Sequence, residues 1–422
     1  MLKRISLFST KKEFFLFLLF CISILFTTVI FEYKNYKEFI RFDSQVVQAT
    51  VIKQYTKEKN SKIFQVLKLH SDDGLTFYTT AKKSLKPLTD RKIEIEIFPN
   101  ELSFYSYFTT FFAKSKIKQI YSETSLKQKV NERISNAHQN QDIANIYQAL
   151  YTSAIVKQEL QTAFSNLGVA HIISISGFHL GVLSAILYFF LSPIYRFFQS
   201  RFFPYRNSKV DLFAIVVVVL FFYMIFLDSP PALVRSFGMF VVGFVLYDRG
   251  IKILSMQTLL VTIFLLLAFF PRLGFTLGFW LSAGGVFYIF LFLIHFKNLS
   301  TLWQIAGISV LVYLFMLPAS LFIFQNFTLY HPLSIILSVL FTPFYPLSIF
   351  LHFVGYGDFF DSFLAWLLTL SRDGTKIELS PYLFLLHIEL SFLAIFDKFW
   401  MWALILLSSS IIIYAVYDVA KL

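Results

Sequence analysis

The sequence predicts a polytopic α-helical membrane protein of about nine or ten spans, with a small OB-like β-barrel domain on its outer, periplasmic side. Composition predicts the membrane part, because only 15% of the 422 residues are charged and 57% are hydrophobic. Soluble domains carry about 25% charged residues, so the composition excludes a soluble enzyme. A change from continuous apolar runs to short alternating ones near residue 45 predicts the outer domain.

An N-terminal membrane anchor is expected over residues 1–32. The run Phe14–Phe31 contains no charged residue and follows a basic N-terminus, formed by Lys3, Arg4, Lys11 and Lys12. Because basic flanks stay in the cytoplasm, the chain should emerge on the periplasmic side, where residues 33–165 follow. No small-residue cleavage site comes after the apolar run, which favours an uncleaved anchor over a signal peptide.

Short alternating runs predict an OB-like periplasmic domain over residues 33–100. The expected strands are Val46–Tyr55, Ile63–His70, Leu75–Thr80 and Lys92–Phe98. Four or five strands of this length form a small barrel or sheet, and an OB-like barrel fits this size.

Basic residues are frequent in this domain. The candidates for a surface that guides a polyanion are Lys53, Lys62, Lys82, Lys83, Lys86, Arg91 and Lys92. Aromatic side chains such as Tyr55 and Tyr78 lie between them and offer faces on which bases can stack. An ordinary solvated strand surface explains the same charges, so both interpretations stay open.

Residues 101–165 are expected to form interfacial amphipathic helices. The aromatic run Leu102–Phe112 is too short to span a bilayer, and the chain turns basic just after it. Apolar residues then recur with helical spacing from Gln128 to Gln161, which predicts an amphipathic helical pair.

Residues 166–422 contain the long apolar runs of a transmembrane domain. A basic loop between two of these runs is expected in the cytoplasm and contains Arg196, Arg201, Arg206 and Lys209. The far ends of the two spans that flank this loop, near His171 and near Leu227, are then expected at the outer face. Two polar motifs meet there, HIISISGFHLG (His171–Gly181) and DSPPALVRS (Asp228–Ser236).

The first motif places polar residues inside a membrane segment, where such groups commonly line a substrate path. The candidates for this lining are His171, Ser174, Ser176, Gly177 and His179. Ordinary helix packing explains the Ser and Gly residues equally directly, since Gly177 and Gly181 form a G-x-x-x-G pair.

Two catalytic interpretations of the same motif are weaker. On a continuous helix His171 and His179 would lie about 12 Å apart, too far to share one zinc ion. Ser176 followed by His179 resembles part of a hydrolase site, with Asp228 as the acid, but the first glycine of G-x-S-x-G is replaced by Ser174. We therefore expect no enzyme activity.

The second motif contains a proline pair at the start of a span, which is where proline is tolerated. Arg235 falls about one turn into that span. Its guanidinium can snorkel to lipid headgroups, pair with Asp228, or point inward and bind phosphate in bidentate fashion. The sequence does not choose among these three.

The segment GVAHIISISGFHLGVL resembles the ComEC family of competence proteins, whose pattern is Gly-x-x-His-x-x-x-(Ile/Ala)-Ser-Gly-x-His-x-Gly. The positions on that pattern are Gly168, His171, Ser176, Gly177, His179 and Gly181. DSPPALVRS, the stretch Leu273–Phe287 and the stretch His331–Pro343 also resemble the family, in the same order. The resemblance implies an inner-membrane channel that conducts single-stranded DNA into the cytoplasm during natural transformation.

The resemblance also implies partners. These are single-stranded DNA, the lipid bilayer, a periplasmic DNA receptor and cytoplasmic strand-handling or helicase proteins. The sequence lacks the H-x-H-x-D-H run of the metallo-β-lactamase-like domain found in many family members, so a separate nuclease is expected. Ser338 stands where the family has Asn.

No cofactor and no metal are expected. The single cysteine, Cys21, excludes an intrachain disulfide, and no Walker run G-x-x-x-x-G-K-[ST] occurs, so the energy for transport must come from elsewhere. The alternative functions are a transporter for a small or lipid-linked substrate and an intramembrane hydrolase.

Overall fold

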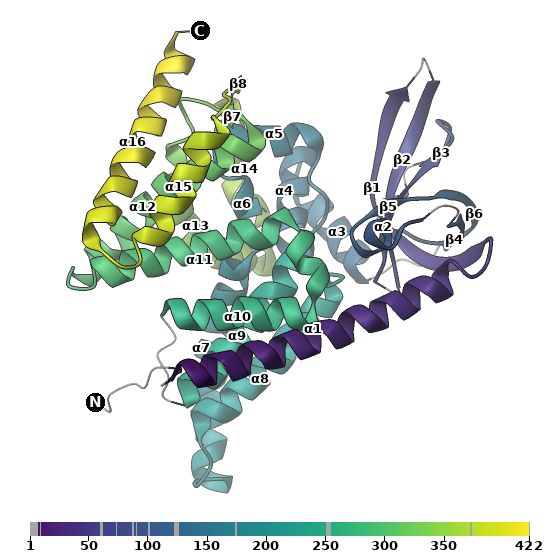
Figure 1. Cartoon of the computed structure of the whole chain (residues 1–422). Helices are drawn as coiled ribbons and strands as arrows, with labels where there is room; N and C mark the ends of the chain where they lie inside the picture. Colours follow the sequence, from purple (N-terminus) through teal and green to yellow (C-terminus); the bar gives the residue numbers. More distant parts are fainter. Residues whose placement is uncertain are drawn as a thin grey trace. The chain divides into compact units, whose positions relative to one another are not determined.

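The computed structural model describes residues 7–8, 10–59, 62–72, 74–86, 88–89, 91–99, 102–121, 126–173, 175–249, 255–371 and 374–421. The chain divides into two compact units. One, called here the strand unit, contains residues 10–133 and 264–276; the other, the helical unit, contains residues 1–9, 134–263 and 277–422. Figure 1 shows both units with the labels used below.

The strand unit begins with the long helix α1 (Lys11–Phe39), whose first turn is capped by Thr10. The helix contains the expected anchor but continues about two turns beyond it. Tyr36 and Phe39 in this extension are buried in the core of the sheet that follows, so the anchor and the sheet share one apolar cluster. The Tyr36 hydroxyl also donates to the Leu102 carbonyl at 2.7 Å.

A six-stranded sheet follows α1, in the order β5-β3-β2-β1-β4-β6. Its strands are β1 (Gln45–Lys59), β2 (Lys62–Ser71), β3 (Thr76–Ala81), β4 (Lys92–Phe98), β5 (Phe111–Phe112) and β6 (Lys114–Ile120). The four strands expected from alternation are confirmed. Side chains at every second position of β4 are buried, as the half-buried pattern requires.

The sheet fits the expected OB-like domain, but it is open and does not close into a barrel. Register shifts between Val51 and Lys53 and between Glu94 and Ile95 curl it strongly, as bulges do. Its two edges approach at Thr79 and Ser115, whose hydroxyls lie 2.6 Å apart. The two-residue strand β5 pairs with β3 over too short a length to complete a ring of backbone hydrogen bonds.

The interfacial helix expected over Leu102–Phe112 is also wrong, because only α2 (Phe104–Phe108) is helical there. The basic residues that follow lie on β6, where lysines alternate with smaller or apolar residues and pair with β4. Tyr107 of α2 and Phe111 of β5 lie in the apolar core and are almost fully buried, whereas Tyr105 and Phe112 are exposed.

Two elements divide between the units, α3 (Leu126–Ala137) and α10 (Met256–Phe269); the short turn η1 (Pro271–Phe275) belongs to the strand unit. The helices of the helical unit are α4 (Gln141–Thr152), α5 (Gln158–Asn166), α6 (Ala170–Ile173), α7 (Gly177–Phe202), α8 (Ser208–Phe226), α9 (Pro231–Asp248), α11 (Leu277–His295), α12 (Thr301–Phe324), α13 (Leu333–Val354), α14 (Asp361–Thr369), α15 (Pro381–Leu393) and α16 (Lys398–Ala420). A turn η2 (Gly357–Phe360) and a pair of two-residue strands, β7 (Asn326–Phe327) and β8 (Thr375–Lys376), complete it.

Seven helices in the described part of the chain are long and apolar enough to cross a membrane. They are α1, α7, α8, α11, α12, α13 and α16. This number is smaller than the nine or ten spans that the apolar runs predict. The apolar helices α10 and α15 have only 14 and 13 residues, so each rises about 20 Å, less than the hydrocarbon core of about 30 Å.

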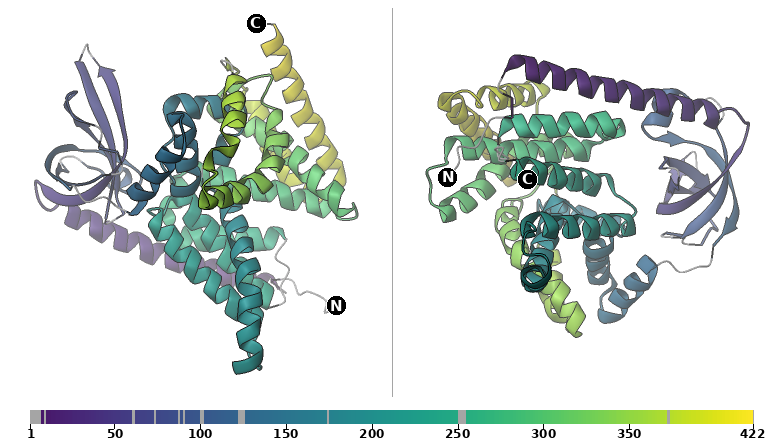
Figure 2. Two further views of the ribbon diagram at one scale, coloured as in Figure 1. Left: turned by 180° about the vertical axis from the view of Figure 1, so that it is seen from behind. Right: turned by 90° about the horizontal axis from the view of Figure 1, so that it is seen from below.

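The helical unit is built from side-by-side helices. Helices α7 and α8 run together as a long hairpin, and α16 packs against α12 and α15 (Figure 2). Buried polar groups join some of these helices. His387 of α15 contacts the Tyr288 hydroxyl of α11 and the Phe315 carbonyl of α12, both at 3.0 Å, as expected for polar contacts between helices in an apolar surrounding.

Candidate functional site

The first motif forms a break between two helices, not the start of one continuous span. Helix α6 ends at Ile173 and α7 begins at Gly177. Ser174 lies outside the described residues. Ser176 is the N-cap of α7, and its backbone N–H donates to Nδ1 of His179 at 3.2 Å. The Ser176 hydroxyl lies 3.2 Å from the same nitrogen.

His179 holds an unpartnered donor inside the protein. Because Nδ1 accepts the Ser176 N–H, the neutral ring carries its proton on Nε2. The residue is 1% exposed, and Nε2 has no hydrogen-bond partner in the described part of the chain. The rings of Phe341 and Tyr345 pack around it, with centroids 5.3 and 4.7 Å away. A buried N–H without an acceptor costs about 1–3 kcal/mol.

Gly177 and Gly168 allow close approaches at this site. A Cβ on Gly177 would lie 3.0 Å from the Ser236 hydroxyl, so the first turns of α7 and α9 touch here. Gly168 has a φ of 71°, and a Cβ there would lie 2.7 Å from Nδ1 of His331. Gly181 has open space where its Cβ would be, so close packing of the expected G-x-x-x-G pair holds at Gly177 only.

His171 lies on the other side of the break. Its side chain is exposed, and Nε2 lies 3.5 Å from the hydroxyl of Ser338 on α13. The structure therefore places Ser338, the departure from the family pattern, beside the first histidine of the motif. His331 lies just before α13 and is buried. Burial lowers the pKa of its imidazole to about 4 and keeps the ring neutral.

Arg235 of the second motif points into the helical unit. It is 4% exposed, and Nη1 donates to the Gly278 carbonyl of α11 at 2.8 Å. The guanidinium carbon lies 5.9 Å from the ring centroid of Phe279. Nε has no hydrogen-bond partner among the described residues. This burial argues against a side chain that snorkels to lipid headgroups.

Asp228 lies in the turn before α9. Its φ is 61° and that of Ser229 is 49°, so two successive residues adopt the left-handed conformation. The side chain of Asp228 is exposed. The turn brings α9 against α7, where Ser236 meets Gly177, but Arg235 faces α11 whereas His179 faces α13. The two motifs are therefore adjacent, with their donors directed to different neighbouring helices.

The basic residues of the strand unit lie mostly on its surface. Exposed side chains are those of Lys82, Lys83, Lys86, Arg91 and Lys92; Lys53 is half-buried, and the side chain of Lys62 is outside the described residues. Lys92 forms an ion pair with Asp72 at 2.6 Å. The segment after β3 is held on the sheet because Gln65 donates to the Lys83 carbonyl at 3.0 Å and Gln54 to the Lys86 carbonyl at 3.2 Å.

Sequence reasoning missed a second basic feature of this unit. Lys53 of β1 lies directly opposite Lys68 of β2, and Lys68 lies opposite Tyr78 of β3. The Lys68 ammonium lies 5.7 Å from the Tyr78 ring centroid, and Lys53 lies 5.6 Å from that of Tyr55. Partial burial lowers the pKa of Lys68. Only the strand register shows that two lysines and two tyrosines share this patch.

Comparison with known proteins adds independent evidence. The "ComE operon protein 3" of Bacillus subtilis (strain 168) is 27% identical over 194 residues, covering 44% of this chain and 23% of that protein. An uncharacterized protein of Aquifex aeolicus (strain VF5) is 26% identical over 180 residues, covering 43% of this chain and 39% of that protein. The match thus spans well under two thirds of either relative, and no solved structure matches the chain.

The family model described as "Competence protein" matches residues 152–421. This range contains both polar motifs and the helices α7 to α16 that surround them. Because the match covers more than half of the sequence, the chain belongs to the competence protein family.

Proposed function

We propose that this chain conducts single-stranded DNA across the inner membrane into the cytoplasm during natural transformation. Membership of the competence protein family supports a role in DNA uptake. The observation that carries the finer proposal is a pair of buried donors in adjacent motifs, Nε2 of His179 and Nε of Arg235, which have no hydrogen-bond partner among the residues that the structure describes. A passing phosphate would supply the acceptors that these donors lack, which is how a polyanion is stabilised inside an apolar bundle.

The strand unit supports the same proposal. Its exposed lysines attract a polyanion, and the patch of Lys53, Lys68, Tyr55 and Tyr78 combines charge with aromatic faces. Proteins that bind single strands without sequence preference use this combination. We place this unit on the periplasmic side, with the N-terminus in the cytoplasm, because of the basic residues that precede α1.

A hydrolase is the second candidate, because the Ser176 hydroxyl lies 3.2 Å from a histidine nitrogen. Two observations weigh against a hydrolase. The nitrogen that would act as base already accepts the Ser176 backbone N–H. The opposite nitrogen, which an acid such as Asp228 would have to orient, has no partner among the described residues. A transporter of a small substrate finds no comparable support in the contacts.

Uptake separates these functions when DNA entry and DNA binding are scored independently. We expect His179→Ala to lower entry of labelled DNA into the cytoplasm while accumulation of DNA outside stays unchanged, because the buried donor is lost but the outer surface is intact. The control is His70→Ala on β2, which should leave both measurements unchanged. Normal entry in His179→Ala at normal membrane abundance would contradict the proposed path.

The outer surface is tested by DNA binding to the full purified chain. Changing Lys82, Lys83 and Lys86 together to Gln should weaken binding of a labelled single-stranded oligonucleotide and lower the slope of log K against log salt by about 2, since each phosphate contact contributes about 0.7. The charge-matched control changes Lys297, Lys398 and Lys421 to Gln. Equal salt slopes in the two variants would leave the strand unit without a guiding role. A fragment that ends at residue 100 is unsuitable, because it lacks β6.

A further inference from the structure

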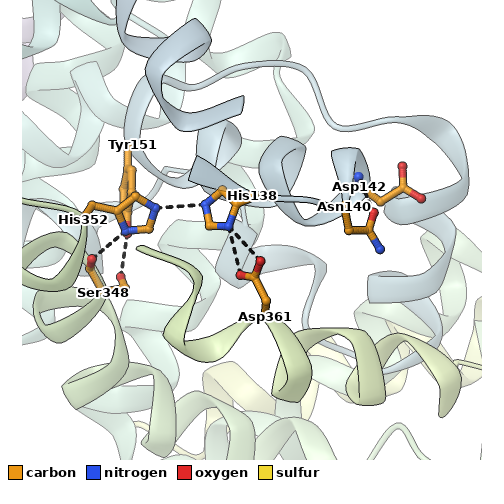
Figure 3. A network of polar contacts seen from close by, with 7 residues as sticks. All are labelled: His138, Asn140, Asp142, Tyr151, Ser348, His352 and Asp361. Atoms are coloured by element: carbon orange, nitrogen blue, oxygen red, sulfur yellow. Dashed lines mark hydrogen bonds and ion pairs between the residues drawn. The ribbon is translucent and has the colours of Figure 1, made fainter. Parts of the chain in front are cut away.

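Three titratable side chains from separate segments meet in the helical unit, outside both motifs (Figure 3). His138 lies between α3 and α4, His352 lies in the last turn of α13, and Asp361 is the first residue of α14. The His138 side chain is fully buried, and that of Asp361 is 20% exposed. These three residues are called the His–His–Asp trio below.

Each imidazole is held by an acceptor at Nδ1. Nδ1 of His138 lies 2.9 and 3.0 Å from the two oxygens of Asp361. Nδ1 of His352 lies 2.8 Å from the backbone carbonyl of Ser348, which can only accept. The Tyr151 hydroxyl, 3.3 Å from the same nitrogen, donates to the Ser348 hydroxyl at 2.8 Å. His352 must therefore carry a proton on Nδ1.

The remaining nitrogens face each other. Nε2 of His138 lies 3.1 Å from Nε2 of His352, a hydrogen-bond distance. If both rings were neutral with protons on Nδ1, two lone pairs would oppose each other across this gap. One proton must lie between them, and another between His138 and Asp361. All contacts are satisfied only when the trio binds one proton more than two neutral imidazoles and an ionised carboxylate.

The surroundings favour this extra proton. It makes the net charge of the trio zero, which lowers the cost of burial. The other titratable groups that face the trio are Tyr147 and Tyr151 of α4 and Asp358 of η2. Burial raises the pKa of both tyrosines, so they stay neutral, and Asp358 adds negative charge that favours a bound proton. Asn140 caps α4 and fixes the segment next to His138.

We infer that the His–His–Asp trio is a proton-binding site, and that the bound proton joins the α3–α4 segment to α13 and α14. Loss of the proton leaves two nitrogen lone pairs 3.1 Å apart, so one of the segments must withdraw. The inference stands on these contacts alone and does not require that the chain conducts DNA. It does connect pH to α13, which carries Ser338 beside His171.

A divalent metal ion is the competing occupant. Histidines that bind metals commonly donate Nδ1–H to a carboxylate or carbonyl, as both do here. The proton is favoured because a direct N···N distance of 3.1 Å already suits a hydrogen bond, and no three His, Cys, Asp or Glu side chains in the described part of the chain, the trio included, are placed so that they could hold one metal ion.

The test is thermal unfolding of the full purified chain in detergent between pH 5.5 and 8.5. An unfolded histidine loses its proton near pH 6.5, and the proposal requires the folded trio to keep its proton above that pH. The stability from the trio is thus fully present below about pH 6.5 and is lost as pH rises through the folded midpoint, by up to tenfold in the folding equilibrium per pH unit. Wild type should lose several degrees more than His138→Gln over this range.

Two further variants protect the test against a misfolded His138→Gln. Asp361→Asn still accepts from Nδ1 but removes the charge, so the midpoint should move to lower pH. The control is Asp358→Asn, which removes a neighbouring negative charge but no described hydrogen bond to either imidazole, so the midpoint should move less than in Asp361→Asn. An unchanged pH profile in both His138→Gln and Asp361→Asn overturns the proposal.

The metal alternative predicts the opposite pH dependence. A metal ion competes with protons for the same lone pairs, so metal-derived stability grows as pH rises. Stability that increases with pH in zinc chloride, falls on addition of EDTA and is absent in His138→Gln would overturn proton binding in favour of a metal site. No effect of zinc or EDTA on wild type supports the proton.

Discussion

Replacement of Ser176 by leucine is expected to abolish DNA entry, whereas alanine retains most of it. Ser176 is the half-buried N-cap of α7 at the break between the two helices of the first motif. Alanine loses the N-cap, which costs about 1 kcal/mol of folding stability, but it keeps the close contact between Gly177 and Ser236. Leucine loses the cap and also adds bulk at the point where α7 meets α9. The measurement is transformation frequency at equal membrane abundance.

The same pair of variants separates conduction from catalysis. A nucleophile cannot tolerate loss of its hydroxyl, whereas a residue that lines a path can. The control is Ser200→Leu, an equal change at an exposed position in the last turn of α7, which should transform normally. An inactive Ser176→Ala that inserts at normal abundance, together with a partly active Ser176→Cys, would favour the hydrolase.

Replacement of Arg235 by lysine is expected to lower transformation at least about tenfold. The guanidinium donates through Nη1 to the Gly278 carbonyl while Nε has no partner in the part of the chain that the structure describes, so one planar group can bond the protein and a phosphate together. Lysine keeps the charge but has a single nitrogen, so it cannot donate to two acceptors from one planar group. A charge-assisted hydrogen bond contributes about 1.5–3 kcal/mol, and 1.4 kcal/mol corresponds to tenfold.

The matched control for this variant is Arg249→Lys. Arg249 is exposed at the C-terminal end of the same helix, where positive charge alone is sufficient. It should transform at the wild-type level. Full transformation by Arg235→Lys at normal abundance would show that only charge is needed at position 235, contrary to the phosphate-contact role.

The membrane helices and the main strands follow from local patterns. Continuous apolar runs predict α7, α8 and α16, and alternation predicts β1 to β4, because each pattern records which face of a short segment is buried. The failed prediction has a cause outside the local pattern. The aromatic run Leu102–Phe112 is typical of an interfacial helix, but Tyr107 and Phe111 pack into the core between α1 and the sheet, a partner that no window of sequence reveals.

The candidate site could also be predicted only in part. The motifs that contain His171, His179 and Arg235 could be recognised from the sequence, because polar residues are rare in apolar runs. The directions in which these side chains point could not be predicted from the sequence. Whether Arg235 faces lipid or the protein interior depends on the rotation of α9 against α11, and the unpartnered nitrogens of His179 and Arg235 depend on every neighbour that fails to offer an acceptor.

Composition and apolar runs alone determine that this chain is a multi-helix membrane protein with a strand-rich segment after its first helix, since burial in lipid demands long apolar segments whatever surrounds them. The open curl of the sheet, the break before Gly177 and the meeting of His138 with His352 and Asp361 come only from tertiary packing. His138 is more than 200 positions from each of the other two, and the hydrogen bonds that join them exist only when three separately folded segments lie within about 3 Å of one another.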